Sequence, residues 1–113
     1  MTTQLTGQAE AKREFKKRVH SWAETLGVTV NWLGVRDMKR KWASCSINGN
    51  LNFNSELLDL DIELQDYVIV HELLHFSVPN HGRLWKSLMT AHLGDYQELE
   101  RQLAAQQPGT GGV

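Results

Sequence analysis

The sequence predicts a single α+β domain in which one helix precedes a three-stranded antiparallel sheet and further helices follow it. The spacing of apolar residues carries this prediction, because it is helical over residues 9–26, alternates over 28–35 and becomes helical again after residue 60. At 113 residues, the chain is long enough for one modest hydrophobic core but not for two. We therefore expect one domain over residues 9–105, followed by a disordered tail over 106–113.

The first expected element is an amphipathic helix over residues 9–26. Its apolar stripe includes Phe15, Val19 and Trp22, and Gly27 is a natural terminator. The opposite side carries a row of cations, namely Lys12, Arg13, Lys16 and Lys17. This side is expected to face solvent, where Glu14 can pair with Arg18 one turn later.

Three strands are expected next, over residues 28–35, 41–47 and 51–54. Asn48-Gly49 between the last two is a strong hairpin signal, because both positions of the favoured two-residue turn need positive φ. We predict that the three strands form an antiparallel meander. The last strand, nearest in sequence to the following helix, is the candidate edge strand that an extended peptide could join.

The remaining chain predicts a short turn or helix over 55–60 and then a buried helix that begins near residue 60. Asp59 or Asp61 can cap this helix, and Pro79 is expected to end it because proline lacks an amide hydrogen. A further helix is expected to end near Gly94. The spacing of Tyr96, Leu99 and Leu103 predicts a last one.

The buried helix contains the motif that points to chemistry. His71 and His75 are four residues apart, so they lie on one face of a helix, and Glu72 lies at the edge of that face. His81 adds a third imidazole after the chain has turned. Three protein ligands with a fourth position open are typical of a catalytic zinc site.

The alternative is a buried helix whose histidines hydrogen-bond within the core. Burying two imidazoles and a carboxylate on an apolar helix would require several polar partners. A metal ion satisfies the imidazoles at once, so the metal interpretation is favoured.

Two blocks of the sequence resemble the YgjP-like metallopeptidases, a family related to the SprT-like and WLM zinc peptidases. The first block is Lys41-Trp42-Ala43-Ser44-Cys45-Ser46 with Gly49-Asn50 and Leu51-Asn52-Phe53-Asn54. The second runs from Asp66 through His71-Glu72-Leu73-Leu74-His75 to Asn80-His81-Gly82 and Leu84-Trp85. Together they cover about residues 40–90.

The resemblance implies a zincin-like fold and a zinc-dependent hydrolase that cleaves peptides or proteins. It implies His71, His75 and His81 as ligands of Zn²⁺ and Glu72 as the catalytic base. Lys41 and Ala43 replace the family's usual arginine and glycine, and a single helix replaces its longer N-terminal region. The number of residues between His71 and His81 equals that between the first and third histidines of the metzincin motif. However, Val78 occupies the position of the metzincin glycine, which disfavours a metzincin turn.

The expected mechanism is attack of a zinc-activated water on a scissile carbonyl, with Glu72 as general base. Tyr67, Arg83 and His92 are the candidates for a second oxyanion donor. Trp85 is expected to pack under His81, and Asn80 is a candidate partner that orients a histidine. Cys45 is interpreted as a small residue in a strand.

Two other classes of function fit parts of the sequence. A zinc-containing binding module without turnover suits the small size, but such a site has no need of Glu72. Nucleic-acid binding through the helix cations and Lys39, Arg40 and Lys41 is weakly supported, because a formal net charge of −1 favours a solvated face. The single cysteine, the absence of a signal-like segment and the lack of a long apolar run predict a cytoplasmic protein that does not enter membranes.

Overall fold

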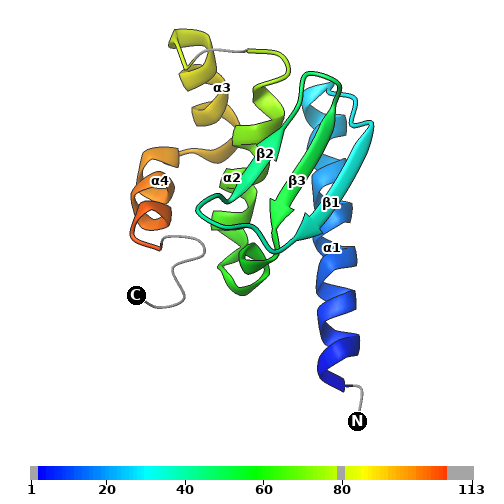
Figure 1. The fold of residues 1–113 in the computed structure, drawn as a ribbon. Coiled ribbons are helices and arrows are strands. Elements are labelled where there is room, and N and C mark those ends of the chain that lie inside the picture. Colours follow the sequence, from blue (N-terminus) through cyan, green and yellow to red (C-terminus); the bar gives the residue numbers. More distant parts are fainter. Residues whose placement is uncertain (1–2, 79–80, 107–113) are drawn as a thin grey trace.

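The computed structural model describes residues 3–78 and 81–106. Four α-helices, one 3-10 helix and three strands occur in the described residues, in the order α1 (Thr3–Leu26), β1 (Trp32–Arg36), β2 (Ala43–Cys45), β3 (Asn50–Asn54), η1 (Ser55–Asp59), α2 (Ile62–Leu74), α3 (Arg83–Leu93) and α4 (Tyr96–Ala104). Figure 1 shows the sheet lying over α1 and α2, with α3 and α4 beside α2 on the side away from α1. No helix in the described part of the chain combines the length and apolar character needed to span a bilayer.

The sheet is mixed, so the predicted antiparallel meander is wrong. Its strand order is β1-β3-β2, with β3 antiparallel to β2 but parallel to β1. The predicted edge strand, β3, is therefore the central one, and β1 and β2 form the two edges. The predicted hairpin between β2 and β3 is present, but in its Asn48-Gly49 pair Gly49 alone adopts a positive φ, of 86°.

Burial explains why β3 takes the centre. Leu51 and Phe53 are fully buried, whereas no residue of β2 is, and β1 buries one glycine. The six-residue connection over 37–42 is also longer than a tight hairpin, which lets β2 skip the position beside β1. An alternating pattern predicts strands, but it does not say which strands pair.

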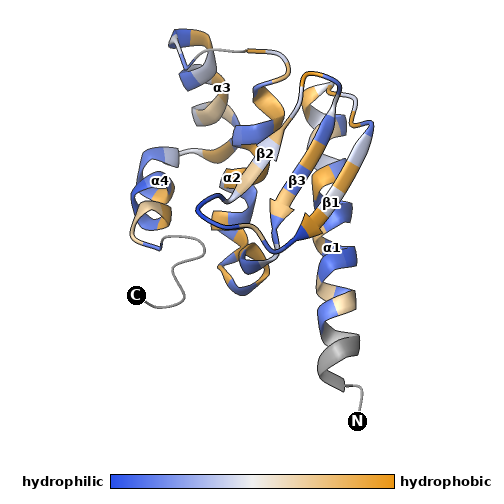
Figure 2. Cartoon of the chain, in the orientation of Figure 1, coloured by the Kyte–Doolittle hydropathy of each residue, from blue (hydrophilic) through white to orange (hydrophobic). Residues whose placement is uncertain are grey.

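The hydrophobic core lies between the sheet and the two helices behind it. Phe15 of α1 meets Phe53 of β3 edge to face, with ring centroids 5.1 Å apart. Figure 2 shows hydrophilic and hydrophobic residues alternating along α1, as expected for a helix buried on one side. Helix α2 is buried along most of its length, with eight of its 13 residues buried.

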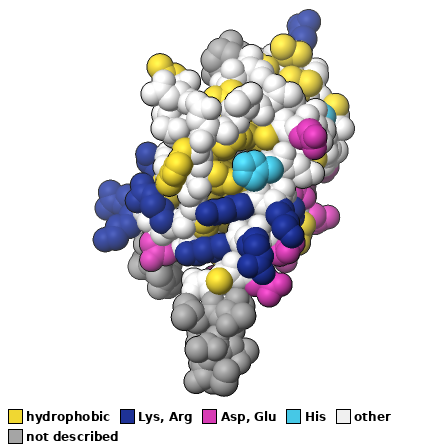
Figure 3. Space-filling view, turned by 90° about the vertical axis from the view of Figure 1, so that its right-hand side faces the viewer, with side chains coloured by type: hydrophobic (Ala, Val, Ile, Leu, Met, Phe, Trp, Pro, Cys, Tyr) yellow, Lys and Arg dark blue, Asp and Glu magenta, His cyan; other side chains and the backbone are white. Residues whose placement is uncertain are grey.

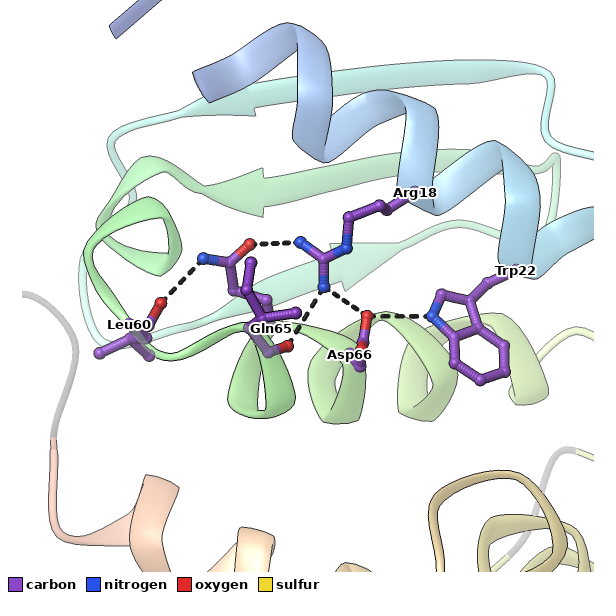
Figure 4. A network of polar contacts seen from close by, with 6 residues as sticks. Arg18, Trp22, Leu60, Gln65 and Asp66 are labelled. Atoms are coloured by element: carbon purple, nitrogen blue, oxygen red, sulfur yellow. Dashed lines mark hydrogen bonds and ion pairs between the residues drawn. The ribbon is translucent and has the colours of Figure 1, made fainter. Parts of the chain in front are cut away.

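A polar network joins α1 to α2 (Figure 4). Arg18 donates to the Asp66 carboxylate and to Gln65, and the Trp22 indole donates to the same carboxylate over 3.0 Å. The sequence predicted that Arg18 pairs with Glu14. In the structure Arg18 pairs instead with Asp66 of α2. Glu14 lies beside Lys17 instead.

The helix boundaries agree with the sequence in part. Helix α1 ends before Gly27 as predicted but begins at Thr3, six residues earlier than expected. Helix α2 follows Asp61, whose side chain makes no capping bond, and it ends at Leu74, well before Pro79. Helices α3 and α4 occupy the predicted positions, and the predicted tail lies outside the described residues except for Gln106.

Candidate metal centre

Helix α2 positions two of the three histidines. His71 belongs to its last turn, and His75 follows the helix directly but keeps helical backbone angles, with φ −61° and ψ −23°. The one-turn relation between them is thus preserved, and their ring centroids lie 4.8 Å apart. Both residues, His71 and His75, are partly buried.

His81 completes the cluster from the segment before α3. Its ring centroid lies 5.2 Å from that of His71 and 5.0 Å from that of His75. The Nε2 atoms of His75 and His81 are 3.5 Å apart. Since His81 is exposed, the cluster opens to solvent on its side.

The cluster fits a divalent metal ion. One nitrogen from each of the three histidines lies within 4.8 Å of the other two. Two nitrogens bound to one tetrahedral zinc stand about 3.4 Å apart, close to the observed separation of His75 and His81. Burial lowers the pKa of His75, and the neighbouring His71 and His81 act in the same direction while Glu72 opposes them. The neutral imidazole that a metal requires is therefore favoured.

Trp85 of α3 supports the cluster as predicted. Its indole lies 4.3 Å from the His81 ring at an interplanar angle of 32°, and it meets His71 edge to face. The indole is buried, and its Nε1 has no hydrogen-bond partner among the described residues. Asn80, the predicted orienting partner, lies outside the described residues.

Glu72 lies next to the histidines and has two neighbours. Its Oε2 is 3.2 Å from Nδ1 of His71, and its side chain is only 14% exposed. The second neighbour is Cys45 of β2, whose thiol pKa is raised by burial, by the charge of Glu72 and by a hydrogen bond to that carboxylate. Cys45 is thus part of the surroundings of Glu72, which sequence reasoning missed.

The three candidates for a second oxyanion donor lie in different places. Tyr67 is near the cluster, with its ring 5.7 Å from His71, but its hydroxyl donates to Glu100 of α4. The pKa of Tyr67 is raised, mainly by burial and secondly by the charge of Glu100. His92 packs edge to face against Trp22, and Arg83 lines a surface hollow along α3. Of the three, Tyr67 alone contacts a histidine of the cluster in the described structure.

The free edge of β2 runs beside α2. Trp42 and Ser46, which flank β2, bond through their backbones to Asn54 and Asn50 of β3. Since bonded and non-bonded pairs alternate in an antiparallel ladder, the backbone N–H and C=O groups of Ala43 and Cys45 point away from β3. They present bonding groups that a further strand could use.

Comparison with known proteins identifies the family of the chain. The family model described as YgjP-like, metallopeptidase domain matches residues 4–106. The chain is similar to the crystal structure of the metallopeptidase zymogen jannalysin of Methanocaldococcus jannaschii, with a TM-score of 0.73 and 26% identity over 81% of this chain and 95% of that one. It also shares the fold of the metallopeptidase zymogen abylysin of Pyrococcus abyssi, with a TM-score of 0.69 and 20% identity over 81% and 93% of the two chains. No curated protein matches the chain.

Proposed function

The chain belongs to the YgjP-like metallopeptidase family and is a metal-dependent peptidase, and from this premise we propose that it cleaves peptide bonds with a zinc ion held by His71, His75 and His81. The observation that carries this assignment is the convergence of three imidazoles, with ligand nitrogens within 4.8 Å of one another, beside Glu72. The proposed catalytic domain spans residues 9–105.

The donor set favours zinc. Three imidazole nitrogens with an open fourth position are a common catalytic zinc environment, although other divalent ions bind such sites and availability selects among them. When bound, zinc would supply a Lewis acid that polarises a carbonyl and makes a water molecule acidic near neutral pH. A proton on Nδ1 of His71, facing Glu72, leaves Nε2 of that ring free to bind the ion.

Glu72 is the proposed general base. Its carboxylate borders the histidines without belonging to the ligand set, which is the position from which an oxygen can take a proton from the attacking water. The same oxygen then delivers that proton to the leaving amine nitrogen. Burial and the nearby charge of Glu72 raise the pKa of the Cys45 thiol, so the thiol keeps its own proton and does not compete with Glu72 for the proton of the water.

The substrate is proposed to lie along the free edge of β2 as an additional strand. The outward backbone groups of Ala43 and Cys45 would bond to it, and this edge runs past Glu72. Beyond the hairpin end of β2 is a hollow of about 320 Å³ lined by residues that include Ile47, Gly49 and Phe76. Ile47 is 99% exposed there and offers an apolar contact to a substrate side chain.

The test combines metal content with hydrolysis of a peptide library. We expect one zinc per chain in the unmodified protein and in Glu72→Gln, and loss of zinc in His81→Ala. His20→Ala, which removes an exposed imidazole on α1, is the matched control and should keep both zinc and activity. Hydrolysis by Glu72→Gln at the unmodified rate would contradict the role of Glu72, and full zinc in His81→Ala would contradict the ligand set.

A further inference from the structure

The charges of this chain are strongly segregated, which the net charge conceals. Residues 12–41 contain nine of the 12 lysines and arginines but three of the 13 acidic residues. This segment therefore carries a net charge of +6, and the rest of the chain carries −7. A formal net charge of −1 is the small difference between two large opposite charges, so it says little about what either part attracts.

The fold gathers many of these cations on one side. The connection 37–42 carries three of them and extends from the end of β1, the strand at the edge of the sheet. On α1, Lys12 and Lys16 lie on one flank of Phe15, and Arg18, which faces α2, lies on the other. Figure 3 shows lysine and arginine side chains forming a band across this side of the molecule. We define the basic face as Lys12, Lys16, Arg36, Lys39, Arg40 and Lys41.

The cations of the basic face are not neutralised within the described structure. Arg13 and Lys17 lie beside Glu10 and Glu14, and Arg18 pairs with Asp66. By contrast, the five ion pairs found among the described residues include no residue of the basic face. The Arg36 side chain donates to a neutral amide, that of Asn52. Their charges remain available to a partner.

The three consecutive cations of this face are held in a defined loop. The Asn54 side chain is fully buried, and its amide donates to the backbone oxygens of Met38 and Lys41 over 3.0 and 2.8 Å. Its oxygen accepts the amide hydrogen of Glu56, so both ends of the side chain are used. Arg40, between the two clamped carbonyls, adopts a φ of 64°. A left-handed arginine persists only where surrounding contacts impose it, and such strain is concentrated at functional positions.

We propose that the basic face binds the phosphate backbone of nucleic acid. Unpaired lysines and arginines on two adjoining elements suit an extended polyanion, and phosphate contacts require no base recognition. An anionic membrane fits less well, because membrane-bound basic surfaces also insert apolar side chains. Among the exposed large hydrophobic residues, Trp32 and Ile47 belong to the opposite end of the sheet from the basic loop, and Leu84 belongs to α3.

This surface is separate from the metal centre. The hollow beside the hairpin places Phe76 and Ser77, which follow α2, near the turn at 47–49. The basic loop lies at the other end of β2, so the metal-binding end of α2 and the basic face occupy different ends of the sheet. Nucleic-acid binding should therefore survive the loss of the metal and of Glu72.

The experiment measures binding of fluorescent DNA, single-stranded and duplex, by anisotropy at several salt concentrations. With about four phosphate contacts, the affinity should fall by about a hundredfold between 50 and 200 mM salt. Two variants test the face, Lys12→Gln with Lys16→Gln, and Lys39→Gln with Arg40→Asn and Lys41→Gln. Asparagine tolerates the left-handed backbone of Arg40. In a plot of log affinity against log salt concentration, each removed contact should make the slope less steep by about one.

The control removes two positive charges elsewhere, with Lys86→Gln on α3 and Arg101→Gln on α4, and should leave DNA affinity within about twofold of the unmodified protein at each salt concentration. The metal content and peptidase activity of the variants of the basic face should not change. The proposal is overturned if the unmodified protein binds neither form of DNA. It is also overturned if the control weakens binding as much as the test variants do, or if the protein binds phosphatidylserine vesicles but no DNA.

Discussion

The indole of Trp85 lies under the imidazole of His81, with ring centroids 4.3 Å apart and the planes 32° from parallel. His81 is the exposed member of the cluster and lies outside the helices and strands. The buried indole of α3 therefore holds this ring from below, in addition to its contacts with the two other histidines. Loss of this contact should weaken metal binding although Trp85 is not a ligand.

We predict that Trp85→Leu binds zinc about tenfold more weakly than the unmodified protein, as loss of a residue that orients a ligand commonly does. Trp85→Phe, which keeps a flat ring beneath His81, should stay closer to the original affinity. Competition with a chromophoric chelator measures both constants, and the melting temperature of the metal-free proteins separates a folding defect from a binding defect. Equal zinc affinity in Trp85→Leu and the unmodified protein would show that the ring contact is unimportant.

The contact between Cys45 and Glu72 predicts an unusual reactivity. Glu72 raises the pKa of the thiol, so Glu72→Gln should increase the thiolate fraction of Cys45 at a given pH. Metal-free Glu72→Gln should then react with iodoacetamide several-fold faster than the metal-free unmodified protein, and the one cysteine of the chain makes the measurement direct. In denaturant, where the contact is absent, the two proteins should react equally fast. Equal rates in the folded proteins would argue against the contact.

The free edge of β2 can be tested with proline. Ala43→Pro removes an amide hydrogen that points away from β3, so the sheet should be retained while the substrate loses a bond. We expect KM for peptide substrates to rise about fivefold to tenfold, since a lost hydrogen bond costs about 1 kcal/mol. Ser44→Pro is the matched control, because its amide faces β3 and its loss should destabilise the fold. If Ala43→Pro leaves KM unchanged, the substrate does not pair with this edge.

The network between α1 and α2 should contribute measurably to stability. Asp66→Asn removes the negative charge that accepts hydrogen bonds from both Arg18 and Trp22. The side chains of Arg18 and Asp66 are only 26% and 24% exposed. We predict a loss of about 1–2 kcal/mol in the free energy of unfolding, measured by urea denaturation. Glu98→Gln, which breaks the solvent-exposed pair with Arg101, should leave the urea midpoint unchanged. Equal effects of the two substitutions would mean that the network is no more stabilising than a surface ion pair.

The sequence predicted features that depend on local spacing. Helical periodicity placed Phe15 in the core, the Asn48-Gly49 pair marked the hairpin, and the interval from His71 to His75 indicated a shared face. These are properties of residues a few positions apart, which helix and turn geometry determines directly.

What the sequence left undetermined depends on contacts between distant segments. The parallel pairing of β1 with β3 and the contact of Cys45 with Glu72 both join segments that no spacing rule relates. The charge segregation is different, because it is visible in the sequence once the cations are counted by segment and not over the whole chain.

The mixed sheet also sets the order in which the chain must assemble. β2 and β3 are joined by a short turn and can pair within microseconds, whereas β1 precedes them and pairs only with β3, the last strand to be made. The strand that is synthesised first therefore waits longest for its partner. Until residue 54 is available, Leu33 and Val35 of β1 have no neighbouring strand, and an unpaired strand is exposed to aggregation.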